Sequence, residues 1–292
     1  MASTTDGELA RMRPARTWRR YRYPGSLIRW GTMLAVLVFI VYAVEYLNVD
    51  LSRLFTMFGR IGEVLSTRYY PPDLDYVLQA GFLESVLETI QMAYLGALFG
   101  ILIAAPLAWL GSWNMTPSRR FLYPVARLFI MGSRSVHEMI WTILFVTILG
   151  FGMLPGVLAL TMFCVGFAGK LFAEEVEAID PGPVEAIRAA GGNAFQVFSY
   201  AVWPQVKVAW TGIGIYTWDV AFRAATVVGF FGAGGMGWYL KRNVQQLENE
   251  RVAAILLSIV ALVLVSEVAS AWARRRVGGG RHRPAKARAA TR

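Results

Sequence analysis

The chain has 292 residues, of which 56% are hydrophobic and 16% charged, and its mean hydropathy is positive at +0.45. This composition excludes an ordinary soluble domain and indicates a protein that crosses a membrane several times. The net charge of +10 is concentrated at the ends, with seven arginines between Arg11 and Arg29 and eight lysines or arginines from Arg274 to Arg292. Because basic residues beside spans mark the cytoplasmic side, we expect two cytoplasmic termini and an even number of spans. We expect these ends to meet membrane lipid and not nucleic acid.

The N-terminal quarter of the chain contains one predicted span. A basic cytoplasmic segment over residues 1–27 lacks the apolar core and cleavage site of a signal peptide. Residues 28–49 form a first apolar run that is long enough to cross a bilayer, which takes roughly 20 helical residues. Within residues 50–75, apolar side chains recur at helical spacing, which predicts an amphipathic helix at the outer membrane surface.

The rest of the chain holds five further predicted spans within residues 76–272, followed by a basic, disordered cytoplasmic tail over residues 273–292. Arg119 and Arg120 stand in a short loop without acids, as expected of the cytoplasmic side. The glycine-rich motif GAGGMG breaks the fifth span. We expect the second span to contain 89–118, and the later spans to cover about 121–150, 157–172, 205–231 and 252–272.

A polar connection separates the fourth and fifth predicted spans and is cytoplasmic in this topology. Asp180 followed by proline predicts the start of a helix. Gly191 and Gly192 permit a left-handed turn that ends it, and Asn193 can cap a second helix that runs towards Pro204. The sequence therefore predicts a helix–glycine–helix bend across the membrane surface.

This bend exposes Glu185 and Arg188 beside small residues such as Ala186. Small side chains allow a groove to hold a helix closely, and the two charges can orient it, so the bend is suited to docking a cytoplasmic partner. The alternative is a helical loop that only connects two spans, and helix signals alone favour this alternative.

The spacing of the connection resembles the permease signature of binding-protein-dependent ABC importers: Glu-Ala-Ala, three residues, Gly, nine residues, Ile, one residue, Leu-Pro. The matching positions are Glu185, Ala186, Gly191 and Pro204, and the departures are Ile187, Ala201 and Trp203. The resemblance implies that residues 180–203 form a coupling helix seated in a cleft of an ATP-hydrolysing subunit. Arg188 and Gly192 would contribute to the same contact.

Longer stretches resemble, in the same order, the phosphonate importer permease: RSVHEMIW (134–141), GKLFAEEVEAID (169–180), PVEAIRAAGG (183–192) and VVGFFGAGGMG (227–237). The resemblance covers roughly residues 75–272. That family commonly has proline at the place of His137, glutamate at Asp219 and asparagine at Ala221, differences that concern the substrate more than the fold.

The resemblance implies an all-α membrane protein with the type I ABC importer permease fold, about six transmembrane helices and a position in the bacterial inner membrane. It implies import of phosphonate or a related phosphorus oxyanion by a homodimer of this chain. Its partners would be two copies of an ABC ATPase and an extracytoplasmic phosphonate-binding protein. The ATPase would bind ATP and Mg, and this chain would hold no cofactor.

Two charged pairs lie at i,i+4 spacing in apolar surroundings, Arg134 with Glu138 and Asp219 with Arg223. Charges near a bilayer core are costly, so these residues should face protein or water. They are either structural ion pairs or part of a translocation pathway, in which guanidinium groups would help an anionic headgroup to pass. Both interpretations stay open.

Other motifs indicate no catalytic or metal site. GAGGMG satisfies the spacing G-x-G-x-x-G, but it follows a membrane span and not a strand, which excludes a dinucleotide fingerprint. No G-x-x-x-x-G-K-[ST] motif is present, so we expect no ATP binding by this chain and no enzyme activity of its own. His137 lacks partners at metal-ligand spacing. Glu84 and Glu88, on one helix face, are interpreted as interfacial charges.

Three alternatives remain beside this hypothesis. The same machinery could import phosphate, phosphite or an amino acid. An ion channel or secondary transporter would need no ATPase. A membrane enzyme acting on lipid headgroups would need clustered His, Asp or Ser at the interface, which the sequence does not contain.

Overall fold

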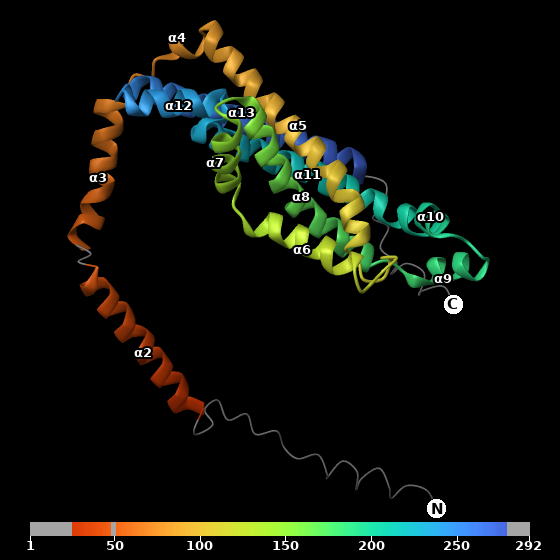
Figure 1. Ribbon diagram of the computed structural model, residues 1–292. Helices are drawn as coiled ribbons and strands as arrows, with labels where there is room; N and C mark the ends of the chain where they lie inside the picture. The colour runs from red at the N-terminus through yellow and green to blue at the C-terminus, as the bar shows by residue number, and fades with distance from the viewer. Residues whose placement is uncertain (1–24, 48–50, 279–292) are drawn as a thin grey trace, which may run out of the picture. The chain divides into compact units, whose positions relative to one another are not determined.

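The computed structural model describes residues 25–47 and 51–278, and every regular element in these two ranges is helical. The predicted all-α class is therefore confirmed for this part of the chain (Figure 1). Most of the predicted basic segment 1–27 and of the predicted tail 273–292 lies outside the described residues. The chain divides into two compact units between Glu63 and Val64.

The first unit contains α2 (Gly25–Tyr46), and α3 (Leu51–Arg68) begins in it. At 22 residues α2 is about 33 Å long, which is enough to cross the hydrocarbon core. None of its residues is buried, and Phe39 is 68% exposed. Such an apolar surface needs lipid or another helix around it.

In α3, apolar Phe58, Ile61 and Leu65 follow helical spacing and are all exposed. The predicted amphipathic helix is thus confirmed, and its place at the outer membrane surface stays a prediction.

The centre of the second unit is the pair formed by α5 (Ala80–Leu110) and α8 (Met153–Glu177). Small residues line their contact, so the two backbones approach closely. A Cβ atom added at Gly96 would lie 2.5 Å from the Cβ of Leu160. Packing of this kind is typical of helices in membranes. No hydrophobic effect drives helices together there, and small residues let them approach closely enough for van der Waals contact to do so. The small buried residues at this centre are Ala93, Ala97, Ala104, Ala108, Ala159, Ala168 and Ala173.

Two further long helices complete the bundle, α11 (Trp203–Val228) and α13 (Asn249–Gly278). The short α4 (Leu74–Val77) and α12 (Gly235–Gln245) pack on α13 at one end of the second unit, whereas α9 (Pro181–Ala189) and α10 (Ala194–Val197) lie at the opposite end (Figure 1). The second unit therefore has two distinct ends, one formed by the broken α11–α12 segment and one by the predicted coupling segment.

Among the described residues, α2, α5, α8 and α13 are long and apolar enough to cross a membrane. Residues 194–233 and 235–245 pass the same test together and are bent by 56°, so they give a fifth span if the pair crosses as one. The predicted third span over residues 121–150 is not a single helix, because these residues form two shorter helices, α6 (Leu122–Ser135) and α7 (Glu138–Leu149).

The break between α6 and α7 has a local cause. Val136 is extended, with φ −100° and ψ 124°, and His137 becomes the N-cap of α7 by accepting a hydrogen bond from Met139 N at 3.3 Å. The indole of Trp141 donates to the carbonyl of Ser133 at 3.3 Å across the break. These contacts satisfy polar groups that a continuous helix would have paired internally.

The other predicted boundaries also need correction. The helix α5 ends at Leu110 and not at the predicted residue 118, because residues 111–121 turn away as a loop. Similarly, α8 and α13 extend beyond the predicted limits at both ends. Apolar runs mark the centre of a buried helix better than its ends, where polar residues continue the helix into the interface.

Candidate functional site

The predicted coupling segment begins with α9 (Pro181–Ala189), which is tied to the start of α11. Asp180 caps α9, because its Oδ1 accepts a hydrogen bond from Gly182 N at 2.9 Å. The side chain of Gln205 accepts from Asp180 N at 3.0 Å and donates to Asp180 O at 3.3 Å. Both ends of the segment are therefore fixed to each other and to the bundle.

A left-handed turn at Gly191 joins α9 to α10 (Ala194–Val197). Gly191 has φ +82°, and Gly192 N donates to Ile187 O at 2.9 Å. A Cβ atom at Gly192 would lie 2.5 Å from Cγ2 of Ile187, so the second glycine is needed for space and the first for its backbone angle. Asn193 and Gln196 form a capping box at the start of α10. The geometry of the predicted bend is confirmed.

The bend has a buried face and an exposed face. Val184 and Val197 are buried in a cluster with the stacked rings of Phe172 and Trp210, whose centroids are 4.5 Å apart. This burial holds α9 against the bundle. On the outside, the predicted contact residues Glu185, Ala186, Arg188 and Gly191 are exposed, and Gly192 is half-buried. A shallow hollow of about 490 Å³ opens there, lined by Ala186, Ile187, Ala190, Gly191, Gly192, Gln196 and Tyr200.

The second helix, predicted to run towards Pro204, continues through that residue. The chain passes from α10 through the π-helical turn η2 (Phe198–Val202) directly into α11. Proline has no N–H and clashes with the carbonyl four residues before it, and a widened turn is one way to accommodate both effects. The predicted coupling segment is thus continuous with the fifth span.

The predicted pair of Arg134 and Glu138 is not formed. The α6–α7 break lies between them, and Glu138 Oε2 instead lies 3.4 Å from Nδ1 of His137. The side chain of Arg134 makes no hydrogen bond or ion pair with any described residue, and Arg134 is exposed. The i,i+4 rule failed here because the two residues do not share one helix.

The second predicted pair is confirmed. Arg223 Nη2 lies 3.2 Å from Asp219 Oδ2, and Ser266 on α13 donates to Asp219 Oδ1 at 3.4 Å. The side chain of Asp219 is 6% exposed, whereas that of Arg223 is 48% exposed. The carboxylate is therefore satisfied within the protein, and the guanidinium keeps an open side.

The predicted break in the fifth span is confirmed at η3 (Gly229–Ala233), where Gly232 has φ +108°. Two residues of α5 then cap α12: Glu88 Oε2 accepts from Gly235 N, and Thr89 Oγ1 accepts from Met236 N, both at 2.9 Å. The sequence interpretation of Glu88 as an interfacial charge missed this contact, which joins residues 147 positions apart. The one signal in the sequence was the motif GAGGMG itself, because glycines offer no side chain to cap the helix that starts within it.

The model of the family described as binding-protein-dependent transport system inner membrane component matches residues 96–279. The chain belongs to this family. The predicted resemblance is confirmed, and the match includes the bend around Gly191 and the broken segment around Gly232. Members are membrane components of transport systems, so the chain is a non-catalytic transport subunit of the inner membrane whose family implies an ATPase subunit and a substrate-binding protein.

Curated relatives of this permease carry names from phosphorus transport. The phosphite transport system permease protein PtxC of Stutzerimonas stutzeri is 40% identical over 200 residues, which are 68% of this chain and 72% of that protein. The phosphate-import permease protein PhnE of Mycolicibacterium smegmatis is 33% identical over 252 residues, which are 86% of this chain and 47% of that protein.

Solved structures of ABC transporters share the fold. A chain of the MetNI methionine ABC transporter in an inward facing conformation has a TM-score of 0.57 and 21% identity, covering 68% of this chain and 96% of that one. A chain of a bacterial alginate ABC transporter has a TM-score of 0.58 and 14% identity, covering 88% and 98%. The permease therefore has the fold of ABC importer membrane subunits. In its described part, no three His, Cys, Asp or Glu residues gather where they could hold a metal ion.

Proposed function

We propose that this permease imports phosphonate or a related phosphorus oxyanion, such as phosphite or phosphate, by a cycle that a partner ATPase drives. The observation that carries the proposal is the similarity to two permeases named for phosphite and phosphate import, at 40% and 33% identity. These matches extend over most of the second unit, which contains both the bend and the charged pairs.

The coupling contact is assigned to the exposed face of the bend. Glu185 and Arg188 present opposite charges on either side of small residues, and the hollow beside Gly191 and Gly192 offers a complementary surface to the ATPase. Since α10, η2 and α11 form one continuous path through Pro204, closure of two ATPase subunits would tilt the fifth span. ATP and Mg belong to the ATPase in this scheme.

The pathway for the anion is assigned to Arg134 and Arg223, together with Glu138 and Asp219. A lipid-facing, unpaired arginine near the middle of a membrane is costly, so Arg134 should face water or protein. It lies about 18 Å along α6 from Leu122. A guanidinium can donate two parallel hydrogen bonds to a phosphorus oxyanion.

The assembly consists of two copies of this chain, two ATPase subunits and an extracytoplasmic binding protein, in contact with membrane lipid. The basic residues near both ends of the chain support cytoplasmic termini. That orientation puts α9 on the side of the ATPase and the α11–α12 break on the side of the binding protein.

Reconstitution with the ATPase and the binding protein that are encoded beside this chain in the genome tests the proposal. In proteoliposomes, phosphite, phosphonate or phosphate should stimulate ATP hydrolysis and enter the lumen only with ATP. If an amino acid stimulated ATP hydrolysis and no phosphorus oxyanion did, the substrate would belong to another class. Uptake without ATP, or a chain that binds no ATPase, would refute the coupling scheme in favour of a channel or secondary transporter.

A further inference from the structure

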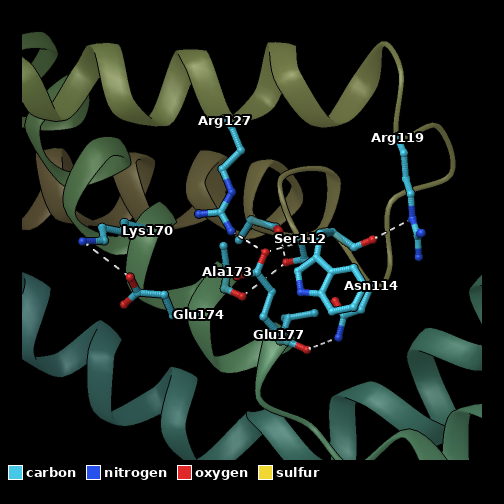
Figure 2. Close-up of polar contacts among 11 residues, drawn as sticks. Ser112, Asn114, Arg119, Arg127, Lys170, Ala173, Glu174 and Glu177 are labelled. Carbon is cyan, nitrogen blue, oxygen red and sulfur yellow. Dashed lines mark hydrogen bonds and ion pairs between the residues drawn. The ribbon is translucent and has the colours of Figure 1, made fainter.

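Polar contacts from two other elements converge on Glu177, the last residue of α8 (Figure 2). Its Oε1 accepts the backbone N–H of Trp113 at 3.1 Å and is also paired with Arg127 Nη2 of α6. The side chains of Arg127 and Glu177 are only 20% and 21% exposed. One carboxylate oxygen thus joins α8, α6 and the loop after α5.

The same loop holds the final carbonyls of α8. Asn114 Nδ2 donates to Val176 O at 2.8 Å, and Ser112 Oγ lies 3.4 Å from Ala173 O (Figure 2). The last four carbonyls of a helix lack a partner within it, so Asn114 caps α8 from outside at Val176, while Ser112, which also donates to Ala108 O at 2.6 Å, adds a weaker contact one turn earlier. We call Ser112, Asn114, Arg127 and Glu177 the clamp.

Beyond the clamp, α6 stays in contact with α8. A Cβ atom at Gly169 would lie 3.2 Å from Ile130 Cγ1, and one at Gly166 would lie 2.6 Å from Arg134 N. Arg134 is seven positions, or about two turns, after Arg127, so both arginines leave α6 on nearly the same side. The clamp therefore fixes one end of a helix pair whose other end carries Arg134.

The clamp also stands directly before the predicted coupling helix, because Asp180, the cap of α9, follows Glu177 after two residues. We propose that Arg127 and Glu177 are positioning residues that transmit a displacement of α9 to α6, and so to Arg134. The inference rests on the proposed coupling function of α9. Arg127 Nε and Asn114 Oδ1 are buried without a partner among the described residues, so the clamp has hydrogen-bonding capacity for a second arrangement.

The charge-neutral variants Glu177→Gln and Arg127→Gln test the proposal in the reconstituted full complex. Glutamine at position 177 keeps an oxygen that can accept from Trp113 N, so the α8 cap is preserved while the ion pair is lost. We expect ATP hydrolysis to continue and the ATP consumed per anion imported to rise about 2- to 30-fold. In the double variant the ATP consumed per anion imported should rise no further than in either single variant, because the two residues act through one contact.

The matched control is the exposed pair Lys170 and Glu174 on the same helix, with N and O atoms 3.5 Å apart and side chains 43% and 50% exposed. Lys170→Gln and Glu174→Gln make the same charge changes and should leave the ratio of ATP to anion unchanged. An unchanged ratio in Glu177→Gln, or additive effects in the double variant, would overturn the proposal.

A distance measurement separates this proposal from the proposed function. Spin labels on cysteines introduced at the exposed positions Met131 of α6 and Ala189 of α9 report their separation in the full chain in nanodiscs; the native Cys164 is buried. The distance distribution should broaden in Glu177→Gln and not in Glu174→Gln. Equal widths would refute the clamp. A wild-type complex without ATP-driven import would refute the proposed function and leave this measurement to decide the clamp.

Discussion

Replacing Gly191 with alanine tests whether the left-handed turn sets the orientation of α9. Gly191 has φ +82°, and a Cβ atom built there meets no atom within 4 Å, so alanine adds backbone strain without a clash. Left-handed backbone costs an L-residue about 1–2 kcal/mol. If the turn relaxes and rotates the exposed face of α9, binding of the ATPase subunit loses the same free energy. That loss corresponds to a dissociation constant about 5- to 30-fold higher.

We therefore expect the dissociation constant between the nanodisc-embedded chain and its ATPase subunit to rise about 5- to 30-fold in Gly191→Ala. Gly191→Asn should retain more affinity, because asparagine tolerates the left-handed region. Gly212→Ala is the control: it lies in α11 with open space around its Cβ and an ordinary φ. Wild-type affinity and melting temperature in Gly191→Ala would refute the view that this turn sets the coupling contact.

Three further substitutions probe the bundle. Gly166→Ala brings a methyl group to 2.6 Å from a backbone nitrogen of α6, which should destabilise the protein by about 1–3 kcal/mol; an undiminished melting temperature would contradict the close packing of α6 on α8. Thr89→Val leaves the Met236 N–H without its acceptor, at a cost of about 1–3 kcal/mol, and should speed hydrogen exchange at the start of α12; unchanged exchange would argue against the cap. Arg223→Gln should slow anion uptake while ATPase binding persists; unaffected uptake would assign Arg223 to structural pairing with Asp219.

The features predicted correctly from the sequence depend on neighbours within a few residues. The cap at Asp180, the turn at Gly191 and the cap at Asn193 are each decided by side chains and backbone groups within one helical turn. The Asp219–Arg223 pair is likewise local, because α11 is continuous between its members. Such features need no knowledge of how the helices pack.

The features that sequence reasoning missed depend on packing. Glu88 meets Gly235 only because α12 folds back onto α5, and Glu177 meets Arg127 across 50 positions. The break at Val136 was hidden because its flanks are apolar enough to read as one span, while the contacts that stabilise it belong to the folded bundle. Hydropathy reports how apolar a segment is and says nothing of where its backbone hydrogen bonds are satisfied.

The two internal breaks differ in how their polar groups are satisfied, and the difference concerns the pathway. Backbone that leaves the helix inside a membrane needs protein or water as a partner. At the α11–α12 break, Glu88 and Thr89 supply that partner from α5, so the N–H groups of Gly235 and Met236 are satisfied within the chain. At the α6–α7 break, Arg134 is exposed and contacts no polar group of the described residues, so its charge needs water, a lipid headgroup, a second protein chain or a passing anion as a partner. The same helix is held at its other end by Glu177, next to the predicted coupling helix. The α6 helix therefore connects the place where ATP-driven movement would enter the permease with the place where an anion would need it.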